Sequence, residues 1–260
     1  MIVPFYIPDL GPSAPLFAML SHELAARGHH IIILTTVPHY PSGQVPNSFR
    51  GKFIQYSTQT NQEIIRIRVP SLKRSSFSGR LLQFACYQIG ATWAGLSKRY
   101  DVAFVANPAL WVWLPFAILC GLRHKPAVFS VYDVYPDVGI RLGIFKNKMV
   151  IAAVSALERY CLEHSSVVRI ITESFRPGVR RLGVPDSKIS LIYDWVDTNL
   201  IKPFSGDTPF IIENSLSGKF IVLYAGNLGL SQGLETILAA AQQLSSEPEV
   251  LFVFVGDGSG

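Results

Sequence analysis

The alternation of short apolar runs with helical patterns is the feature that most constrains the fold of this chain. Apolar runs predict strands at 2–5, 31–35, 64–68, 102–106, 127–132, 167–172 and 189–192. Between them the sequence predicts amphipathic helices at 13–27, 77–98 and 147–164. In the first helix Leu16, Phe17, Leu20 and Leu24 would share one apolar face, and Gly28 would end the helix. This alternation is typical of βαβ units, so we expect an α/β fold with parallel sheets.

A polar, turn-rich stretch at 203–217 predicts a linker between two domains. After it the pattern restarts, with a strand at 220–224, a glycine-rich loop at 226–233, a helix at 234–244 and a strand at 250–255. We therefore predict one domain over 1–203 and the start of a second over 218–260. One βαβ unit cannot cover both faces of a parallel sheet, so we expect the second domain to be incomplete here.

The run from 102 to 122 is apolar enough to raise the question of a membrane span. Pro108 and Pro115 interrupt it, and the run divides into a short strand followed by an apolar helix. We favour this buried strand and helix over a transmembrane segment. A helix lying on a membrane surface stays open as an alternative.

Charge and cysteine content restrict the function further. Residues 1–125 carry twelve Lys and Arg against four Asp and Glu, whereas residues 126–260 carry eleven against fourteen. The basic first half indicates contact with phosphates or an anionic membrane, or simply a basic surface. No nucleic-acid motif accompanies it, so we expect no nucleic-acid partner. Cys86, Cys120 and Cys161 show no metal or disulfide pattern, which indicates no structural metal and a reducing compartment.

Candidate site residues lie in the loops that follow the predicted strands, where ligands bind in α/β folds. The loop at 6–13 leads into a helix N-terminus that could meet an anion, with Gly11 for close approach and Ser13 as cap. The loop at 35–43 presents His39 and Tyr40 on a segment made rigid by prolines. Ordinary capped and surface loops are the alternative interpretation of both.

The loop after the strand at 127–132 brings Asp133, Tyr135 and Asp137, which suit recognition of hydroxyl groups or general-base chemistry as well as a simple turn. In the second domain Gly226 and its neighbours link a strand to a helix and form a phosphate cradle by geometry. That loop matches neither GxGxxG nor GxxxxGK[ST], which disfavours an NAD-dependent enzyme and a P-loop protein.

The chain resembles the retaining glycosyltransferases of family 4, closest to those of colanic-acid, capsule and O-antigen synthesis. An ordered set of motifs carries the resemblance: Gly28-His29, Thr35-Thr-Val-Pro-His-Tyr-Pro-Ser-Gly43, Asp101 with Asn107-Pro108, Tyr132-Asp-Val-Tyr-Pro136, Asp194-Trp-Val-Asp197, Tyr224-Ala-Gly-Asn-Leu-Gly229, Gln232-Gly-Leu-Glu235 and Val255-Gly-Asp-Gly258. These motifs span essentially the whole chain. The resemblance implies a GT-B fold of two Rossmann-like domains, with an acceptor domain first and a nucleotide-sugar domain second.

By resemblance, such a protein moves a hexosyl unit from a nucleotide diphosphate sugar to a saccharide acceptor, often polyprenyl-diphosphate-linked, with retention and without an obligatory metal or other cofactor. It would work in the cytoplasm at the inner face of the membrane, where the basic half and the aromatic helices near Phe84, Tyr87 and Trp93 would dock.

The resemblance also assigns roles. Asp133 and His39 would be catalytic, with Tyr40, Tyr135 and Asp137 on the acceptor side. The donor would meet Gly11, Ser13, Gly226, Asn227 and Gln232.

Three departures and two alternatives accompany this interpretation. Many relatives carry an Arg near Asn227, a Lys near Gln232 and an Asn where this chain has Asp194. The paired glutamates of the family lie beyond residue 260, so we expect this 260-residue piece to transfer nothing by itself.

A non-catalytic binding fragment and another GT-B enzyme, such as a nucleotide-sugar epimerase, are the alternative functions.

Overall fold

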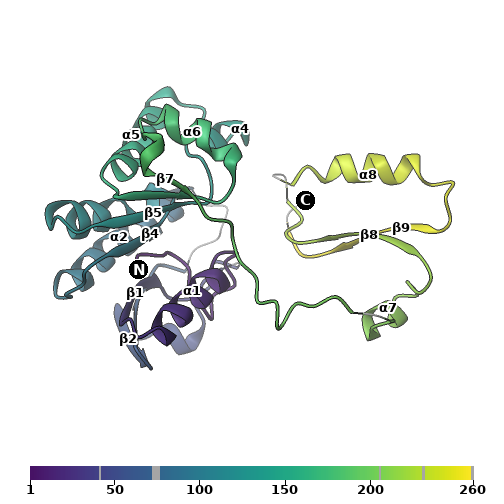
Figure 1. The fold of residues 1–260 in the computed structure, drawn as a ribbon, viewed down its shortest axis with the longest axis horizontal. Coiled ribbons are helices and arrows are strands. Elements are labelled where there is room, and N and C mark those ends of the chain that lie inside the picture. Colours follow the sequence, from purple (N-terminus) through teal and green to yellow (C-terminus); the bar gives the residue numbers. More distant parts are fainter. Residues whose placement is uncertain (41, 72–76, 205, 230–231, 259–260) are drawn as a thin grey trace. The chain divides into compact units, whose positions relative to one another are not determined.

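The computed structural model describes residues 1–40, 42–71, 77–204, 206–229 and 232–258 (Figure 1). The chain divides into two compact units, Met1–Val196 and Asp197–Gly260, which are described one at a time. Pro41, Leu230 and Ser231, which the motifs and loops above include, and Ser205 of the predicted linker lie outside the described residues.

Unit 1 is built on one β-sheet, whose strands correspond closely to the predicted ones. The strands are β1 (Ile31–Thr36), β2 (Ile54–Gln59), β3 (Gln62–Ile67), β4 (Ala103–Ala106), β5 (Ala127–Val131), β6 (Val167–Ile170) and β7 (Ile189–Leu191). Their order is β2-β3-β1 in one part and β4-β5-β6-β7 in the other. Every pair is parallel except β2 and β3.

The first residues of the chain join these two parts. Ile2 pairs in parallel with Leu34 of β1 on one side and with Val105 of β4 on the other. The Ile2 N–H donates to the carbonyl of Phe104 at 2.8 Å, and the Val3 N–H donates to the carbonyl of Leu34 at 3.0 Å. The predicted strand at 2–5 is thus reduced to a single pairing residue, but it lies in the centre of the sheet as a first parallel strand should.

Strand β2 is a strand that the sequence pattern missed, as it missed the short helices at Asp137–Arg141, Arg176–Arg181 and Pro209–Glu213. Its residues Ile54-Gln-Tyr-Ser-Thr-Gln59 are mostly polar and exposed, because the strand is at the edge of the sheet. A two-residue turn with Asn61 at φ 57° connects it to β3 in antiparallel register. The expected α/β fold with parallel pairing is confirmed, and the sheet of unit 1 is mixed through this one antiparallel pair at its edge.

Helices cover both faces of this sheet. Side chains along β1 point alternately to its two faces, and both faces carry buried side chains. Ile33 packs with Phe17 of α1 (Ala14–Ala26), whereas Leu34 packs with the opposite layer. That layer contains α2 (Phe77–Leu96), α3 (Ala109–Pro115), a π-helical turn η2 (Phe116–Leu122) and α5 (Lys148–Glu163). Short helices α4 (Asp137–Arg141) and α6 (Arg176–Arg181) follow β5 and β6 (Figure 1).

The buried stripe of α1 differs from the predicted one. Phe17 is buried, but Leu16, Leu20 and Leu24 are only partly so, and the interior positions are filled by small residues and by Ser21. The Ser21 hydroxyl bonds to the Tyr6 hydroxyl at 2.7 Å, which pairs both polar groups inside the protein. Gly28 ends the helix at φ 90°, as expected for a left-handed cap.

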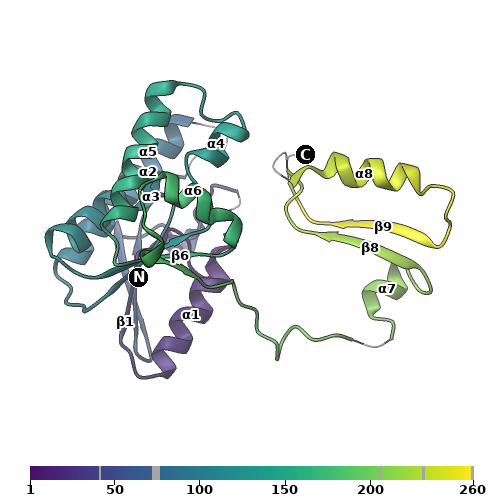
Figure 2. The same cartoon turned by 45° about the horizontal axis from the view of Figure 1, so that its top comes forward.

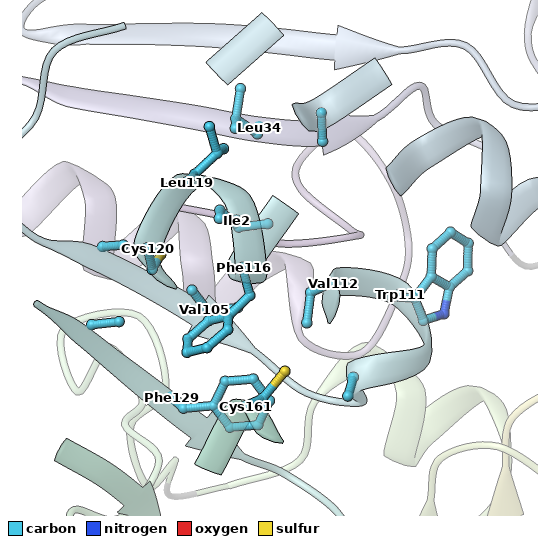
Figure 3. Close-up of a cluster of buried hydrophobic side chains, with 14 of the residues drawn as sticks. Ile2, Leu34, Val105, Trp111, Val112, Phe116, Leu119, Cys120, Phe129 and Cys161 are labelled. Atoms are coloured by element: carbon cyan, nitrogen blue, oxygen red, sulfur yellow. The ribbon is translucent and has the colours of Figure 1, made fainter. Parts of the chain in front are cut away.

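The apolar run at 102–122 forms strand β4, helix α3 and the turn η2, which confirms the buried strand and helix. Phe116 is fully buried and packs edge-on against Phe129 of β5, with ring centroids 5.8 Å apart (Figure 3). Among the described residues, no helix is both long and apolar enough to cross a bilayer.

Unit 2 contains a parallel pair, β8 (Phe220–Ala225) and β9 (Val250–Val255), with α7 (Pro209–Glu213) before it and α8 (Leu234–Gln243) between the strands (Figure 2). Both strands and α8 follow the sequence prediction. Large apolar side chains on each strand and on α8 remain exposed, such as Phe220, Leu223 and Leu238. The described elements of unit 2, two strands and two helices, bury too little surface to form a closed core.

Candidate functional site

A cavity of about 310 Å³ lies in unit 1, among the loops that follow the carboxyl ends of its strands. Three of the predicted site residues line it: His39, Tyr40 and Tyr135. The rest of its wall is largely apolar and includes Trp111 of α3 and Phe145 of the loop before α5. The cavity therefore combines a few polar groups with an apolar wall, as small-molecule sites commonly do.

The His39 ring is held in one orientation by its Nδ1 atom. That nitrogen lies 3.0 Å from the carbonyl oxygen of Val37, 3.4 Å from the Thr36 hydroxyl and 3.7 Å from an oxygen of Asp9. All of these neighbours can accept a hydrogen bond, so the neutral ring carries its proton on Nδ1. The lone pair is then on Nε2, which makes His39 a base available to a ligand in the cavity.

A buried carboxylate that the sequence analysis did not select organises the loops around His39. Asp9 is 3% exposed, and it accepts the N–H of Gly11 at 2.8 Å, of His39 at 2.8 Å and of Tyr40 at 3.3 Å. It thereby links the loop before α1 to the loop after β1. Because buried carboxylates need such partners, this geometry fixes both loops together.

A second polar link, between Asn107 and Glu158, supports the opposite wall of the cavity. The Asn107 side chain accepts the N–H of Tyr132 at 2.8 Å and donates to the carbonyl oxygen of Asp133 at 2.5 Å. Glu158 of α5 accepts from Asn107 at 3.1 Å and from the Ala109 N–H at 2.8 Å. Glu158 was missed, although it lies on the apolar stripe of α5 with Val154 and Cys161, which is the signal for a buried acid.

Burial perturbs the acidic groups near this wall. It raises the pKa of Glu158 to about 7, and the charge of Asp133 adds to the shift. Partial desolvation of its carboxyl group also raises the pKa of Asp133, although the residue as a whole is exposed. The pKa of Tyr135 rises to about 12, chiefly through burial and secondly through Asp133.

Asp137 has a different environment from Tyr135. Its carboxylate accepts from Arg181 at 2.6 Å at the protein surface, in the first turn of α4. The structure thus gives Asp137 a role in joining α4 to α6, and its predicted contact with an acceptor stays a prediction.

The predicted donor residues of unit 1 occupy the turn into α1. Ser13 is at the N-cap position, but its side chain makes no capping bond, contrary to expectation. Gly11 lies so close to Phe5 that an added Cβ would be 2.8 Å from the Phe5 ring. Close packing alone therefore requires a glycine here, and the N–H of Gly11 already bonds to Asp9.

The glycine loop of unit 2 contains the remaining donor candidates. The Asn227 side chain donates to the Gln232 side chain at 3.4 Å, and the Tyr224 hydroxyl donates to the Asn227 carbonyl at 2.8 Å. Gly226 approaches Gly256 so closely that a Cβ on Gly256 would overlap the Gly226 carbonyl. Asn227 and Gln232 are thus brought together at the start of α8.

A buried arginine holds the Asp194-Trp-Val-Asp197 motif against the sheet. Arg169 of β6 donates to Asp194 at 2.7 Å, to the Ile192 carbonyl at 3.0 Å and to Ser130 at 2.9 Å, and it stacks on Trp195 at 5.0 Å. Asp194, the departure from the family pattern, is therefore the carboxylate that neutralises Arg169.

No cluster of three or more metal-ligating residues occurs among the described residues. Cys86, Cys120 and Cys161 are free thiols, and burial raises the pKa of each. The aromatic residues near the predicted membrane-docking helices differ in their exposure to solvent. Tyr87 is fully buried with its hydroxyl bonded to the Leu34 carbonyl at 2.8 Å and therefore belongs to the core, whereas Trp93 of the same helix is 72% exposed.

The mixed and parallel sheets of the two units and their strand-end loops define a protein of the GT-B class. Its structural neighbours have the same fold. Sucrose-phosphate synthase from Thermosynechococcus elongatus superposes with a TM-score of 0.68 at 16% identity, over 98% of this chain and 62% of its own. HepE of Anabaena, solved with UDP-glucose, gives a TM-score of 0.60 at 15% identity over 99% and 61%.

The chain belongs to glycosyltransferase family 4, because the family model for the glycosyl transferase 4-like domain matches residues 13–195. It is 25% identical to WcaI of Escherichia coli, named as a colanic acid biosynthesis glycosyl transferase, over 98% of this chain and 64% of the relative. It is 26% identical to WbjE of Pseudomonas aeruginosa, named as a glycosyltransferase, over 78% and 51%. The chain thus spans between half and two thirds of the length of these relatives.

Proposed function

We propose that this chain is part of a glycosyltransferase that moves a hexosyl unit from a nucleotide diphosphate sugar to a saccharide acceptor, with retention. The observation that carries the proposal is the cavity of unit 1, where His39, Tyr40 and Tyr135 converge in a member of family 4. HepE, a neighbour of the same fold, is described in complex with UDP-glucose, which supports a nucleotide-sugar donor. The donor would meet Gly11 and Ser13 of unit 1, and Gly226, Asn227 and Gln232 of unit 2.

In this proposal unit 1 receives the acceptor. The Nε2 lone pair of His39 would accept a hydrogen bond from an acceptor hydroxyl, and Tyr135 stays protonated and able to donate because its pKa is about 12. Asp133 would orient the hydroxyl that attacks, with Tyr40 and Asp137 nearby. No metal takes part. The family resemblance supports a lipid-linked acceptor, such as a polyprenyl diphosphate sugar, and the mostly apolar wall of the cavity would tolerate its lipid part.

The name of one relative, WcaI, as a colanic acid biosynthesis glycosyl transferase supports a role in polysaccharide synthesis. An acceptor of that kind would place the protein in the cytoplasm, at the inner face of the membrane. The basic charge of residues 1–125 is consistent with such an anionic surface.

The test uses the protein in the length that its gene encodes, with radiolabelled nucleotide sugars and a lipid extract from the source organism. Label should pass into the organic phase, and NMR of the product should show the anomeric configuration of the donor. The His39→Gln and Asp133→Asn variants should lose this transfer while keeping the thermal midpoint of the wild type. Conversion of the donor without any acceptor would instead indicate an epimerase, and binding without turnover would indicate a non-catalytic protein.

A further inference from the structure

The segment from residue 140 to residue 150, here called the rim segment, combines exposed apolar side chains with cations at the mouth of the cavity. Ile144 is 55% exposed and Met149 is 81% exposed, and Ile140, Leu142 and Val150 are exposed as well. Single exposed apolar residues are common on proteins, but a run of this kind in one segment marks an interaction surface.

The rim segment presents these side chains in a defined conformation. Gly143 turns the chain at φ 68°, and the N–H groups of Ile144 and Phe145 both bond to the Gly139 carbonyl, at 2.9 and 3.0 Å. Phe145 points inward, where its ring meets Tyr135 at 6.3 Å. The neighbouring apolar residues are therefore directed outward by an ordered turn that Phe145 anchors.

The charges of the rim segment have one sign. It contains Arg141, Lys146 and Lys148 and no acidic residue. Within the described part of the chain, no carboxylate pairs with any of these three cations. Asp137, the nearest acid before the segment, pairs with Arg181 instead. Apolar side chains between unpaired cations are complementary to an anionic lipid surface, whose headgroups attract the cations while its interface accepts the apolar groups.

The position of the segment connects this surface to the cavity. Ile144 and Val150 line the cavity, together with Leu81 of α2, which is 47% exposed. Figure 2 shows α4 and the beginning of α5 at the same end of unit 1. A lipid surface that covered the rim segment would thus lie directly at the mouth of the cavity.

We propose that the rim segment is the membrane-contact surface of this protein, and that it brings the cavity mouth to an anionic bilayer so that a lipid-borne acceptor enters from the membrane. The proposal deepens the proposed function, on which its second half rests. It places the membrane contact at the rim segment, whereas the sequence-based expectation was the basic first half and the aromatic helices near Phe84, Tyr87 and Trp93.

The test is sedimentation of the 260-residue chain with vesicles of phosphatidylcholine containing one quarter phosphatidylglycerol, and with vesicles of pure phosphatidylcholine. The wild type should pellet with the anionic vesicles at low salt, and high salt should release most of it. The double variant Leu142→Glu, Met149→Glu should lower the bound fraction at least tenfold. Both positions are exposed, so the thermal midpoint should stay that of the wild type.

Leu122→Glu is the matched control, because Leu122 is 74% exposed and is followed by Arg123, His124 and Lys125, but it precedes β5 at the opposite end of the strands. This variant should bind as the wild type does. Absence of wild-type binding, equal binding by the double variant, or loss of binding in the control alone would each overturn the proposal. If the wild type is a dimer and the double variant is a monomer, the surface would instead serve self-association. The assay contains no sugar donor, so its result is independent of whether the protein transfers sugar.

Discussion

Replacement of Glu158 by Gln should remove a pH dependence from the stability of unit 1. Glu158 has a folded-state pKa of about 7 against an ordinary value of 4.5. The Glu158 carboxyl binds its proton more tightly in the folded state than in the unfolded state. Its protonated form therefore stabilises the fold, and this contribution is fully present below pH 4.5. This contribution is lost as the pH rises from 4.5 to 7. A difference of about 2.5 pKa units corresponds to about 3 kcal/mol in the free energy of unfolding.

The substitution also has a pH-independent cost that follows from the hydrogen bonds. Glu158 accepts from Asn107 through one oxygen and from the Ala109 N–H through the other, whereas a glutamine offers only one accepting oxygen. Asn107 cannot turn its amide round without losing its bonds to Tyr132 and Asp133. One buried N–H is therefore left unpaired, which costs about 1 to 3 kcal/mol.

Urea unfolding between pH 5 and 8, followed by tryptophan fluorescence, measures both effects. All four tryptophans lie in unit 1, so their signal reports on that unit. The wild type should lose stability as the pH rises from 5 to 6, and Glu158→Gln should lack this loss. The variant should be the less stable protein at pH 5, and the difference should shrink toward pH 7. Above pH 6 the buried amino group of Met1, whose pKa is lowered to about 6, adds an opposite dependence to both proteins. Glu163→Gln, an exposed change on the same helix, should keep the wild-type dependence. A wild-type profile that is flat between pH 5 and 6 would refute the reasoning.

Three further changes test the site and the core. Asp9→Ala removes the acceptor of three backbone N–H groups, so the free energy of unfolding should fall by roughly 3 kcal/mol, seen as a loss of about 6 to 12 °C in the thermal midpoint. A loss below 2 °C would contradict the linking role of Asp9. Phe116→Ala should cost about 3 to 5 kcal/mol in urea unfolding, since its ring is fully buried against Phe129, while Leu122→Ala on the surface should cost almost nothing. His39→Gln should lower kcat for transfer by about 10² to 10⁴ in the protein as its gene encodes it, and an unchanged kcat would exclude His39 as the base.

The fold was largely predictable because its strands are apolar runs with clear boundaries. β4, β5 and β6 are buried on both faces, and such strands stand out in a sequence. β2 did not stand out, since an edge strand with a solvated face needs few apolar residues. The interior of α1 was misplaced because helical periodicity does not reveal that Ser21 is paired with Tyr6.

The site was predictable only in part. His39, Tyr40 and Tyr135 were found because they follow strand ends, and the topology brings those ends together. Asp9 was missed because its link to His39 spans 30 positions along the chain, and the partner Asn107 of Glu158 is 51 positions away, so that only the place of Glu158 on the apolar stripe of α5 signalled its burial. No local pattern distinguishes a carboxylate that accepts three N–H groups from one exposed to solvent. The roles of the donor and acceptor residues remain predictions that the transfer assay tests.

The pairing of Ile2 between β1 and β4 has a consequence for the order of events during synthesis on the ribosome. On one side Ile2 pairs with Leu34, which is synthesised early. On the other side it pairs with Val105, which is synthesised much later. For about 70 residues of elongation, the first segment can pair on β1 and leave its other edge open. An open edge of this kind recruits foreign strands, so a nascent chain paused before β4 should be the form most prone to aggregation.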